Sequence, residues 1–598
     1  MPDPSKGKPL CESVEQTVRT TKRSPRPTND DILRLIDRWK LYADDAERKE
    51  LLLLEQNPDE LEDSFRCDLA FGTGGLRGIM GPGTNRMNVR TVGKATQGLA
   101  NWLNARFDRP SVVIARDTRA LGERFMRVVA GVLAANGIVT HAYSEPSPTP
   151  TLSFAVRELG CSAGICITAS HNPAEYNGYK VYGETGCQIT TAVASQIQKA
   201  IDGVDPFDDV QTMSFEKALE QGMARWIDAG MHASYLDAVI SLSHGIDCSS
   251  LTVAYTPLNG TGAAFVPEIL KAIGVKRFDL EPIQALPDSS FSTCKRPNPE
   301  EREVLTRGLD LAKRMQADLL LATDPDADRL GVAAKHGEDY TLLTGNEVGI
   351  LLIDHLCSIA QSRRERLDDR VVATTIVSSP LADALAKDYG FELIRTLTGF
   401  KFIGELIDRL EEAGRGSAFL FGFEESYGFL AGTHARDKDA MAATLLVCEA
   451  AARHRSKGLD LVEALDRLYD RYGRCRSKLI SISYPGAKGS LRMREIMDSL
   501  RTDPPASIAG APVTKVNDYK SGATPPPTIN VPENDGVAKP LPPSDVLELD
   551  LGDNESIFIR PSGTEPKVKA YINAFGLDED QVAERLTAFC EEIKGSLG

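Results

Sequence analysis

Three aspartates at alternating positions, Asp324, Asp326 and Asp328, directly follow an apolar stretch of the chain. In an extended loop, alternate side chains share one face. Three carboxylates that face one another repel unless a cation lies between them, and an oxygen-preferring ion such as Mg²⁺ suits them. An EF-hand calcium loop is excluded because Arg329 and Lys335 occupy positions that need glycine and glutamate. A solvated acidic turn is the alternative, but the buried strand expected before these residues favours a magnesium site.

A second candidate is Ser170, which lies in a turn of small residues after another apolar stretch. Open α/β sheets bind ligands at such strand ends, although most serines there only make a turn or cap hydrogen bond. Ser170 beside His171 could indicate a serine hydrolase, but we expect no GxSxG elbow. Adjacent side chains are also expected to point apart, which leaves His171 poorly placed as the base of Ser170. We therefore expect a phosphorylated Ser170 whose phosphate completes the magnesium shell. Lys180 lies within plausible reach as a proton donor or acceptor.

Two further loops carry groups suited to a phosphorylated sugar. Glu424, Glu425 and Ser426 lie in a turn bounded by glycines, where carboxylates and a hydroxyl can hydrogen-bond vicinal sugar hydroxyls. A solvated turn is the alternative there. The loop after the last apolar segments combines positive charge, hydroxyls and free amides, which suit a phosphate-binding nest: its candidates are Arg560, Ser562, Gly563, Thr564 and Lys567. Arg436 and Lys438 are further candidates for phosphate binding, with surface charge as the alternative.

Length and composition limit the possible classes of protein. A chain of 598 residues exceeds what one hydrophobic core holds, so several domains are expected. The formal net charge of −16 argues against a nucleic-acid or acidic-membrane partner. Eleven cysteines occur without a CxxC pair, which is typical of a reducing compartment. The start of the chain has no apolar signal-peptide core and no segment reaches membrane-spanning length, so we expect a cytoplasmic protein.

The elements that must position these loops alternate between helix and strand. Apolar spacing predicts a helix from about residue 29, with Trp39 on its buried face, and then three successive α/β units. The proline-rich region 503–544 is expected to form long loops with little packed structure. Strands at 546–551 and 556–559 and a helix at about 578–593 complete a smaller α+β tail.

Four of these loops together resemble the α-D-phosphohexomutase superfamily, to which phosphoglucomutases and phosphomannomutases belong. The motifs are TASHNP at 168–173, DPDADR at 324–329, GFEES at 422–426 and RPSGTEP at 560–566, in the family's order. The resemblance covers roughly residues 70–575 and is closest to the branch of bacterial phosphoglucomutases and phosphoglucomutase-2-type phosphopentomutases. One departure is Asn259, where relatives often have histidine.

The resemblance implies an α/β fold of three similar α/β domains with mixed sheets plus a smaller α+β C-terminal domain, arranged around a central cleft. We expect an N-terminal extension and domain I with the phosphoserine loop at 1–230 and domain II with the metal loop at 231–345. Domain III with the sugar-binding loop is expected at 346–478, and domain IV with the phosphate-binding loop at 479–598.

The resemblance also implies roles for individual residues. The catalytic group comprises Ser170, His171 and Lys180, and the Mg²⁺ ligands are phosphorylated Ser170, Asp324, Asp326 and Asp328. The substrate-binding positions are Arg77, Arg329, Thr398, Glu424, Ser426, Lys438, Arg560, Ser562, Gly563 and Thr564.

The implied activity is that of an isomerase, an intramolecular phosphotransferase that interconverts glucose 1-phosphate and glucose 6-phosphate. Glucose 1,6-bisphosphate would be its intermediate and activator. Phosphopentomutase activity is the close alternative, and phosphomannomutase or sugar-bisphosphate synthase activity is less favoured. A catalytically silent sugar-phosphate sensor is argued against by the intact serine and aspartates. We expect small-molecule sugar phosphates as partners, no nucleic acid or membrane, and a monomer or homodimer.

Overall fold

A computed structural model describes residues 29–72, 74–484, 489–521, 528–532, 536–562 and 567–598. The chain divides into two compact units, Met1–Asp68 with Gly83–Asn85, and Leu69–Pro82 with Arg86–Gly598. Among the described residues, no helix combines the length and the apolar character that crossing a membrane requires.

The described part of the first unit is helical, as the apolar spacing predicts. Trp39 is 1% exposed and meets Phe65 edge-to-face, with ring centroids 5.5 Å apart. Asp44 begins the second helix through a capping box with Glu47, which satisfies backbone N–H groups at the helix start. The helices are α1 (Asn29–Tyr42), α2 (Asp45–Leu54) and α3 (Pro58–Phe65).

The second unit begins with a mixed sheet of order β1-β5-β4-β2-β3-β6. Val112 and Ile114 of β2 join the core on the side of α4, α5 and α7, whereas Val113 and Ala115 join the core that includes α6. This alternation follows from the two-residue period of a strand, so helices cover both faces. The elements are β1 (Gly75–Ile79), α4 (Val89–Arg106), β2 (Ser111–Arg116), α5 (Gly122–Ala135), β3 (Val139–Ala142), α6 (Thr149–Glu158), β4 (Ala163–Ile167), β5 (Tyr176–Gly183), α7 (Thr191–Asp202), α8 (Phe215–Glu220) and β6 (Ala224–Trp226).

A second mixed sheet, of order β11-β10-β9-β7-β8, follows. Its strand β9 is buried along its whole length and ends at Thr323, directly before the three aspartates. The elements are α9 (Ala229–Ile240), β7 (Thr252–Thr256), η1 (Thr261–Ala264), α10 (Val266–Ala272), β8 (Arg277–Leu280), η2 (Arg302–Leu305), α11 (Thr306–Met315), β9 (Leu319–Thr323), β10 (Leu330–His336) and β11 (Asp339–Leu343).

The third sheet has the order β15-β14-β12-β13-β20. Its strand β20 comes from the proline-rich region, where Ile529 pairs with Leu393. The prediction that this region forms long loops with little packed structure is therefore wrong in part. The elements are α12 (Gly345–Ser362), β12 (Val371–Thr375), α13 (Leu381–Tyr389), β13 (Glu392–Thr396), α14 (Lys401–Glu412), η3 (Gly416–Ala418), β14 (Phe419–Glu424), β15 (Gly428–Ala431), α15 (Ala440–Arg455), α16 (Leu461–Tyr472) and β20 (Thr528–Ile529).

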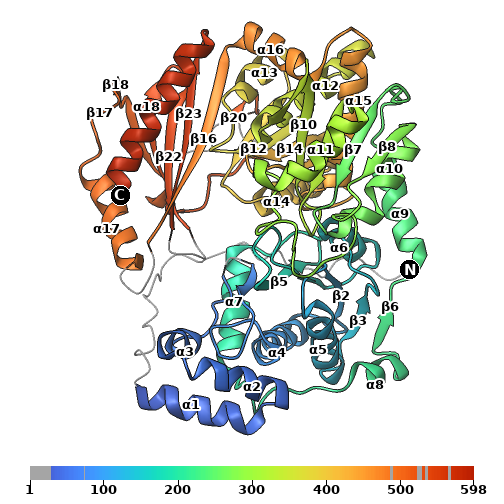
Figure 1. Cartoon of the computed structure of the whole chain (residues 1–598), viewed down its shortest axis with the longest axis vertical. Coiled ribbons are helices and arrows are strands. Elements are labelled where there is room, and N and C mark those ends of the chain that lie inside the picture. The colour runs from blue at the N-terminus through green and yellow to red at the C-terminus, as the bar shows by residue number, and fades with distance from the viewer. Residues whose placement is uncertain (1–28, 73, 485–488, 522–527, 533–535, 563–566) are drawn as a thin grey trace. The chain divides into compact units, whose positions relative to one another are not determined.

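The C-terminal part is an antiparallel sheet of order β16-β23-β22-β21-β19, against which α18 packs (Figure 1). This confirms the predicted change to an α+β tail, and Asp578 caps the final helix as its sequence suggests. The elements are β16 (Arg474–Ser483), α17 (Gly489–Thr502), β17 (Ser507–Ile508), β18 (Ala511–Pro512), β19 (Lys515–Asp518), η4 (Tyr519–Ser521), β21 (Leu547–Gly552), β22 (Glu555–Pro561), β23 (Lys567–Gly576) and α18 (Glu579–Leu597).

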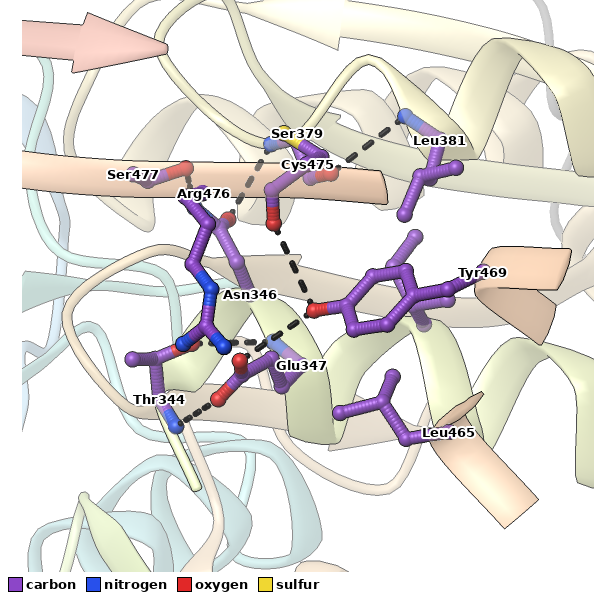
Figure 2. A pocket seen from close by; sticks show the side chains of 11 residues that line it. Thr344, Asn346, Glu347, Ser379, Leu381, Leu465, Tyr469, Cys475, Arg476 and Ser477 are labelled. Atoms are coloured by element: carbon purple, nitrogen blue, oxygen red, sulfur yellow. Dashed lines mark hydrogen bonds between the residues drawn. The ribbon is translucent and has the colours of Figure 1, made fainter. Parts of the chain in front are cut away.

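A small cavity of about 50 Å³ lies between β16 and the helices α12 and α16 of the third domain. Figure 2 shows polar side chains from α12, α16 and β16 converging on it. Asn346 donates to Ser477 Oγ at 3.1 Å and accepts the Ser379 N–H at 3.1 Å, while the Tyr469 hydroxyl donates to Glu347 at 3.1 Å. The first of these bonds joins β16 to α12, and none of the predicted site residues lines this cavity.

Candidate active site

Ser170 follows β4 in a backbone conformation that few residues adopt, with φ at +51°. Its side chain is buried, and its Oγ donates a 2.8 Å hydrogen bond to Asp324 Oδ2. His171 Nδ1 lies 3.2 Å from the same Oγ. The expectation that these neighbours point apart is therefore wrong, because the left-handed turn at Ser170 breaks the extended backbone in which adjacent side chains alternate.

The pattern Gly160-Cys161-Ser162-Ala163-Gly164 does have GxSxG spacing. Ser162 directly precedes β4, however, and its N–H bonds the Ser111 carbonyl across the sheet. A nucleophile elbow needs a serine at the turn from a strand into a helix. This serine lies at the opposite end of its strand, so the serine-hydrolase alternative gains nothing from it.

A buried arginine holds the Ser170 loop in place. Arg119 ion-pairs with Asp117 at 3.1 Å, and both side chains are 0% exposed. The guanidinium also donates to the backbone carbonyls of Ser170, Asn172, Pro173 and Tyr176. Asp117 in turn accepts the Thr168 hydroxyl at 2.6 Å, and Thr168 Oγ1 accepts the Ser170 N–H at 2.8 Å. Sequence reasoning missed this pair, although both residues follow β2 in the sequence RDTR.

The three aspartates lie together, as their spacing predicts. Their ligand oxygens lie within 4.8 Å of one another, and the side chains are at most 2% exposed. Asp324 Oδ1 accepts the backbone N–H groups of Asp328 and Arg329, both at 3.1 Å. Within the described residues, Asp326 Oδ1 and Asp328 Oδ1 are buried without a hydrogen-bond partner. Orphaned carboxylate oxygens need a partner, and an all-oxygen donor set fits a hard divalent cation.

Two lysines balance the negative charge of this group. Lys180 Nζ lies 2.8 Å from Asp326 Oδ2 and 3.4 Å from Asp328 Oδ2, and Lys438 Nζ lies 3.2 Å from Asp328 Oδ2. Burial alone lowers the pKa of Lys180, but Asp326 and Asp328 outweigh it and raise that pKa above its usual value. Burial, reinforced by Asp326 and Asp328, raises the pKa of Asp324 well above its usual value. Lys180 is therefore a cation, and in the same site the carboxyl group of Asp324 favours its protonated form.

The turn after β7 contacts the loop of the three aspartates, because the Thr261 N–H bonds the Pro325 carbonyl at 2.9 Å. Asn259 is 1% exposed, with its amide donating to the carbonyls of Ile283 and Leu286 at 3.1 and 2.8 Å. Its side chain is therefore engaged within the local fold. A Cβ on Gly260 would lie 2.4 Å from Pro325 Cα, so only glycine allows this close approach.

The predicted sugar-binding loop connects β14 and β15. Ser426 Oγ donates to Glu424 Oε1 at 3.2 Å, so the two predicted groups lie together. Glu425, the third member of the predicted cluster, accepts the Thr375 hydroxyl at 2.9 Å. Burial, with Glu424 beside it, raises the pKa of Glu425 to about 7. Lys438 links this loop to the metal loop, because its stem fills the space beside Gly428.

Arg329 joins the metal loop to the sugar-binding loop through backbone pairing with Gly428. Its guanidinium lies 2.7 Å from Glu300, a partner that the sequence did not indicate. Arg436, by contrast, is 0% exposed and ion-pairs with Asp408 and Glu411. Its guanidinium is therefore already engaged within the protein.

The fourth loop is described at its two ends. Arg560 donates to the Thr398 hydroxyl, which brings two predicted substrate residues together. The Ser562 N–H bonds the Lys567 carbonyl at 2.7 Å, and Gly563 and Thr564 lie outside the described residues. Arg77, on β1, reaches Asn172 of the Ser170 loop at 3.5 Å. The contacts thus connect Ser170, His171, Lys180, Lys438 and the aspartates in one group, and Arg560 with Thr398 in another.

Comparison with known proteins identifies the family. Residues 68–206, 233–337 and 344–472 match the alpha/beta/alpha domains I, II and III of Phosphoglucomutase/phosphomannomutase. The chain belongs to this family. It is 36% identical to "Phosphoglucomutase" of Staphylococcus aureus (strain MRSA252) over 92% of this chain and 97% of that protein. It is likewise 36% identical to "Phosphoglucomutase" of Staphylococcus epidermidis, over 89% of this chain and 95% of that protein.

Solved structures share the fold at lower identity. A putative phosphomannomutase from Thermus thermophilus covers 88% of this chain and 99% of its own, with a TM-score of 0.66 and 22% identity. The open form of pp63/parafusin, a phosphoglucomutase from Paramecium, covers 88% of this chain and 93% of its own, with a TM-score of 0.64 and 18% identity. The predicted fold, three α/β domains with mixed sheets and a further C-terminal domain, is confirmed.

Proposed function

We propose that this chain is a phosphoglucomutase that interconverts glucose 1-phosphate and glucose 6-phosphate in the cytoplasm. Its relatives of 36% identity carry that name over nearly their full length. The single observation that carries the proposal is the 2.8 Å contact between Ser170 Oγ and Asp324 Oδ2. It supports a serine phosphate placed against a carboxylate group that can hold a divalent cation.

In the proposed reaction, phospho-Ser170 gives its phosphoryl group to the free hydroxyl of glucose 1-phosphate. The Ser170 Oγ–P bond breaks and a P–O bond to the sugar forms. The proton of the sugar hydroxyl ends on Ser170 Oγ. The bound glucose 1,6-bisphosphate then turns over and returns its other phosphoryl group to Ser170. Glucose 6-phosphate leaves, and the phosphoserine is restored.

Asp324, Asp326 and Asp328 are the residues that would hold Mg²⁺ beside the serine phosphate. When bound, the ion would supply positive charge against the charge that develops on the transferring phosphoryl group. The unpartnered oxygens of Asp326 and Asp328 support this assignment. The hydrogen bonds from backbone N–H groups to Asp324 keep the loop curved around the same point.

His171 and Lys180 are proposed to move the protons. Burial and the positive charges of Arg329 and Arg77 hold the pKa of His171 well below its usual value, so its ring is neutral near pH 7. A neutral Nδ1 at 3.2 Å can accept the Ser170 proton when the serine is rephosphorylated. Lys180, kept as an ammonium by Asp326 and Asp328, is the proton donor of the pair.

The remaining residues are proposed to hold the substrate. Glu424 and Ser426 suit the sugar hydroxyls, and Arg77, Arg329 and Lys438 suit the phosphate near the reacting centre. The second phosphate is assigned to the C-terminal loop and its neighbour: Thr398, Arg560, Ser562, Gly563 and Thr564. A separate site for the second phosphate lets one end react while the other is held.

The substrate is tested by kcat/KM for glucose 1-phosphate, mannose 1-phosphate and ribose 1-phosphate, each assayed with its own bisphosphate and Mg²⁺. The proposal predicts the highest kcat/KM for glucose 1-phosphate. A higher value for ribose 1-phosphate would make the chain a phosphopentomutase and overturn the assignment of the sugar. Continuous release of inorganic phosphate without isomerisation would overturn the mutase reaction itself.

A further inference from the structure

A second group of metal-ligating side chains lies outside the loops of the proposed active site. It comprises His244, in the segment after α9, His355 in α12 and Glu449 in α15. One ligand atom from each residue lies within 4.8 Å of the others. The side chains of His355 and Glu449 are 0% exposed, and that of His244 is 21% exposed. The group is therefore buried, with one edge open to solvent.

The carboxylate of Glu449 is fixed in place as an anion. Its Oε1 accepts the Ser243 hydroxyl at 2.6 Å and the His244 N–H at 2.9 Å, and its Oε2 accepts the same N–H at 3.1 Å. Burial raises the pKa of Glu449, but its polar contacts with His244, His355 and Ser243 outweigh burial and lower that pKa. The anchored Oε2 lies 3.3 Å from His244 Nδ1 and 3.9 Å from His355 Nε2.

His355 is a buried imidazole whose ring lies too far from Glu449 for a hydrogen bond. Neither of its ring nitrogens has a hydrogen-bond partner within the part of the chain that the structure describes. A neutral imidazole carries one donor and one acceptor, and buried polar atoms are almost always paired. A protonated His355 paired with Glu449 would be the alternative, but burial outweighs the attraction of Glu449 and, with Arg453, lowers the pKa of His355 and favours its neutral ring. Its lone pair is thus free to bind a metal beside a fixed anion.

We propose that His244, His355 and Glu449 bind one divalent cation of the zinc class, with solvent at the fourth position. Zinc bonds of about 2.0–2.1 Å in a tetrahedron place neighbouring ligand atoms about 3.3 Å apart. The separation of Oε2 from His244 Nδ1 is 3.3 Å, and that from His355 Nε2 is 3.9 Å. The second distance needs to shorten by about 0.5 Å to meet that geometry, and the ligand atoms of the two histidines lie within 4.8 Å of each other. Two imidazoles select zinc over Mg²⁺, which prefers oxygen ligands.

Such an ion would fasten the segment after α9 to two helices of the third domain. His244 belongs to the second α/β unit, whereas α12 and α15 pack against each other in the third. The role is structural and does not depend on the proposed mutase activity. A bound ion should therefore raise thermal stability even in a protein without phosphorylated Ser170.

The test uses tag-free, full-length protein that has been stripped with a chelator and equilibrated with Zn²⁺ in the presence of excess Mg²⁺. Zinc per chain is measured after desalting, and the melting temperature is recorded with and without Zn²⁺. The variants are His355→Gln and Glu449→Gln. His336→Gln is a matched control, because His336 also pairs with a carboxylate but at a half-exposed surface position. Asp326→Asn separates this site from the aspartate group.

The expected result is about one zinc per wild-type chain, retained in His336→Gln and Asp326→Asn and lost in His355→Gln and Glu449→Gln. Zinc should raise the melting temperature of the wild type and of the two control variants, but not that of His355→Gln or Glu449→Gln. If either site variant fails to fold, the absorption spectrum of Co²⁺ bound to the wild type tests the proposal instead. Two imidazoles and one carboxylate should give the spectrum of tetrahedral Co²⁺. Zinc retained in His355→Gln, zinc lost only in Asp326→Asn, or no Co²⁺ spectrum would overturn the proposal.

Discussion

Arg119 Nη2 donates a 2.5 Å hydrogen bond to the backbone carbonyl of Ser170. The same guanidinium is ion-paired with Asp117 and reaches three more carbonyls of the loop. A planar fork of donors can hold several acceptors at once, which an ammonium cannot. The left-handed backbone at Ser170 is therefore maintained by a side chain that itself lies away from solvent.

Replacing Arg119 should impair both activity and stability. Arg119→Met leaves the buried Asp117 without its cation, so the free energy of unfolding should fall by about 3–5 kcal/mol. Arg119→Lys keeps the charge, so it should lose less stability while kcat still falls. Urea unfolding and mutase assays measure the two effects. Arg127→Lys, at an exposed pair with Glu123, is the control and should change stability by less than about 1 kcal/mol. Wild-type kcat in Arg119→Lys would contradict the positioning role.

Asp324→Asn should stabilise the metal-free protein while it lowers activity. Burial and the neighbouring aspartates raise the pKa of Asp324, so its ionised form costs folding energy. Because the folded pKa is raised, this residue's contribution is fully present below its unfolded pKa and is lost as pH rises through the folded pKa. Without Mg²⁺, the wild type should therefore lose more stability than Asp324→Asn between about pH 4 and pH 7. Chemical denaturation at several pH values measures the difference, and parallel wild-type and variant profiles would refute it.

Lys180→Met should remove the proposed proton donor. Loss of a positioned acid or base lowers rates by about 10²–10⁴-fold, so kcat should fall by that range. Asp326 also loses its cation while Asp328 keeps Lys438, so the metal-free variant should melt at a lower temperature than the wild type and recover partly with Mg²⁺. Steady-state kinetics and thermal melts test both effects. Lys335→Met, at a half-buried lysine that bonds Gln316, should leave kcat unchanged.

The sugar-binding loop should titrate near neutral pH. Burial and Glu424 raise the pKa of Glu425 to about 7, which favours its protonated form. Its contribution to stability is therefore present at low pH and is lost as pH rises through about 7. Between about pH 5 and pH 8, the free energy of unfolding of the wild type should fall by about 1–3 kcal/mol relative to that of Glu425→Gln. Denaturation across this range measures it, with the exposed Glu412→Gln as control. Equal pH slopes for wild type and Glu425→Gln would contradict the assignment.

The local chemistry of the main loops could be predicted from sequence, because the relevant residues are near neighbours in the chain. Asp324, Asp326 and Asp328 converge as alternation after a buried strand requires. Ser426 likewise meets Glu424 across a short turn. The domain boundaries proposed from sequence remain a prediction.

What the sequence could not reveal were contacts between distant segments and local backbone conformations. Arg119 bonds carbonyls more than fifty positions later, and Lys438 meets Asp328 from another domain. The proximity of His171 to Ser170 depends on a positive φ that no motif encodes. Strand β20 joins a sheet built mostly from residues more than one hundred positions earlier, so a proline-rich composition could not reveal its pairing.

The most direct test of the account is the mutase turnover of Ser170→Ala beside the wild type, with glucose 1-phosphate, glucose 1,6-bisphosphate and Mg²⁺. Peptide mass spectrometry of the same samples locates the phosphoryl group. The account predicts that wild-type Ser170 carries the phosphoryl group and loses it to glucose 1-phosphate, and that Ser170→Ala shows no turnover above background. Near-normal turnover of Ser170→Ala would contradict it.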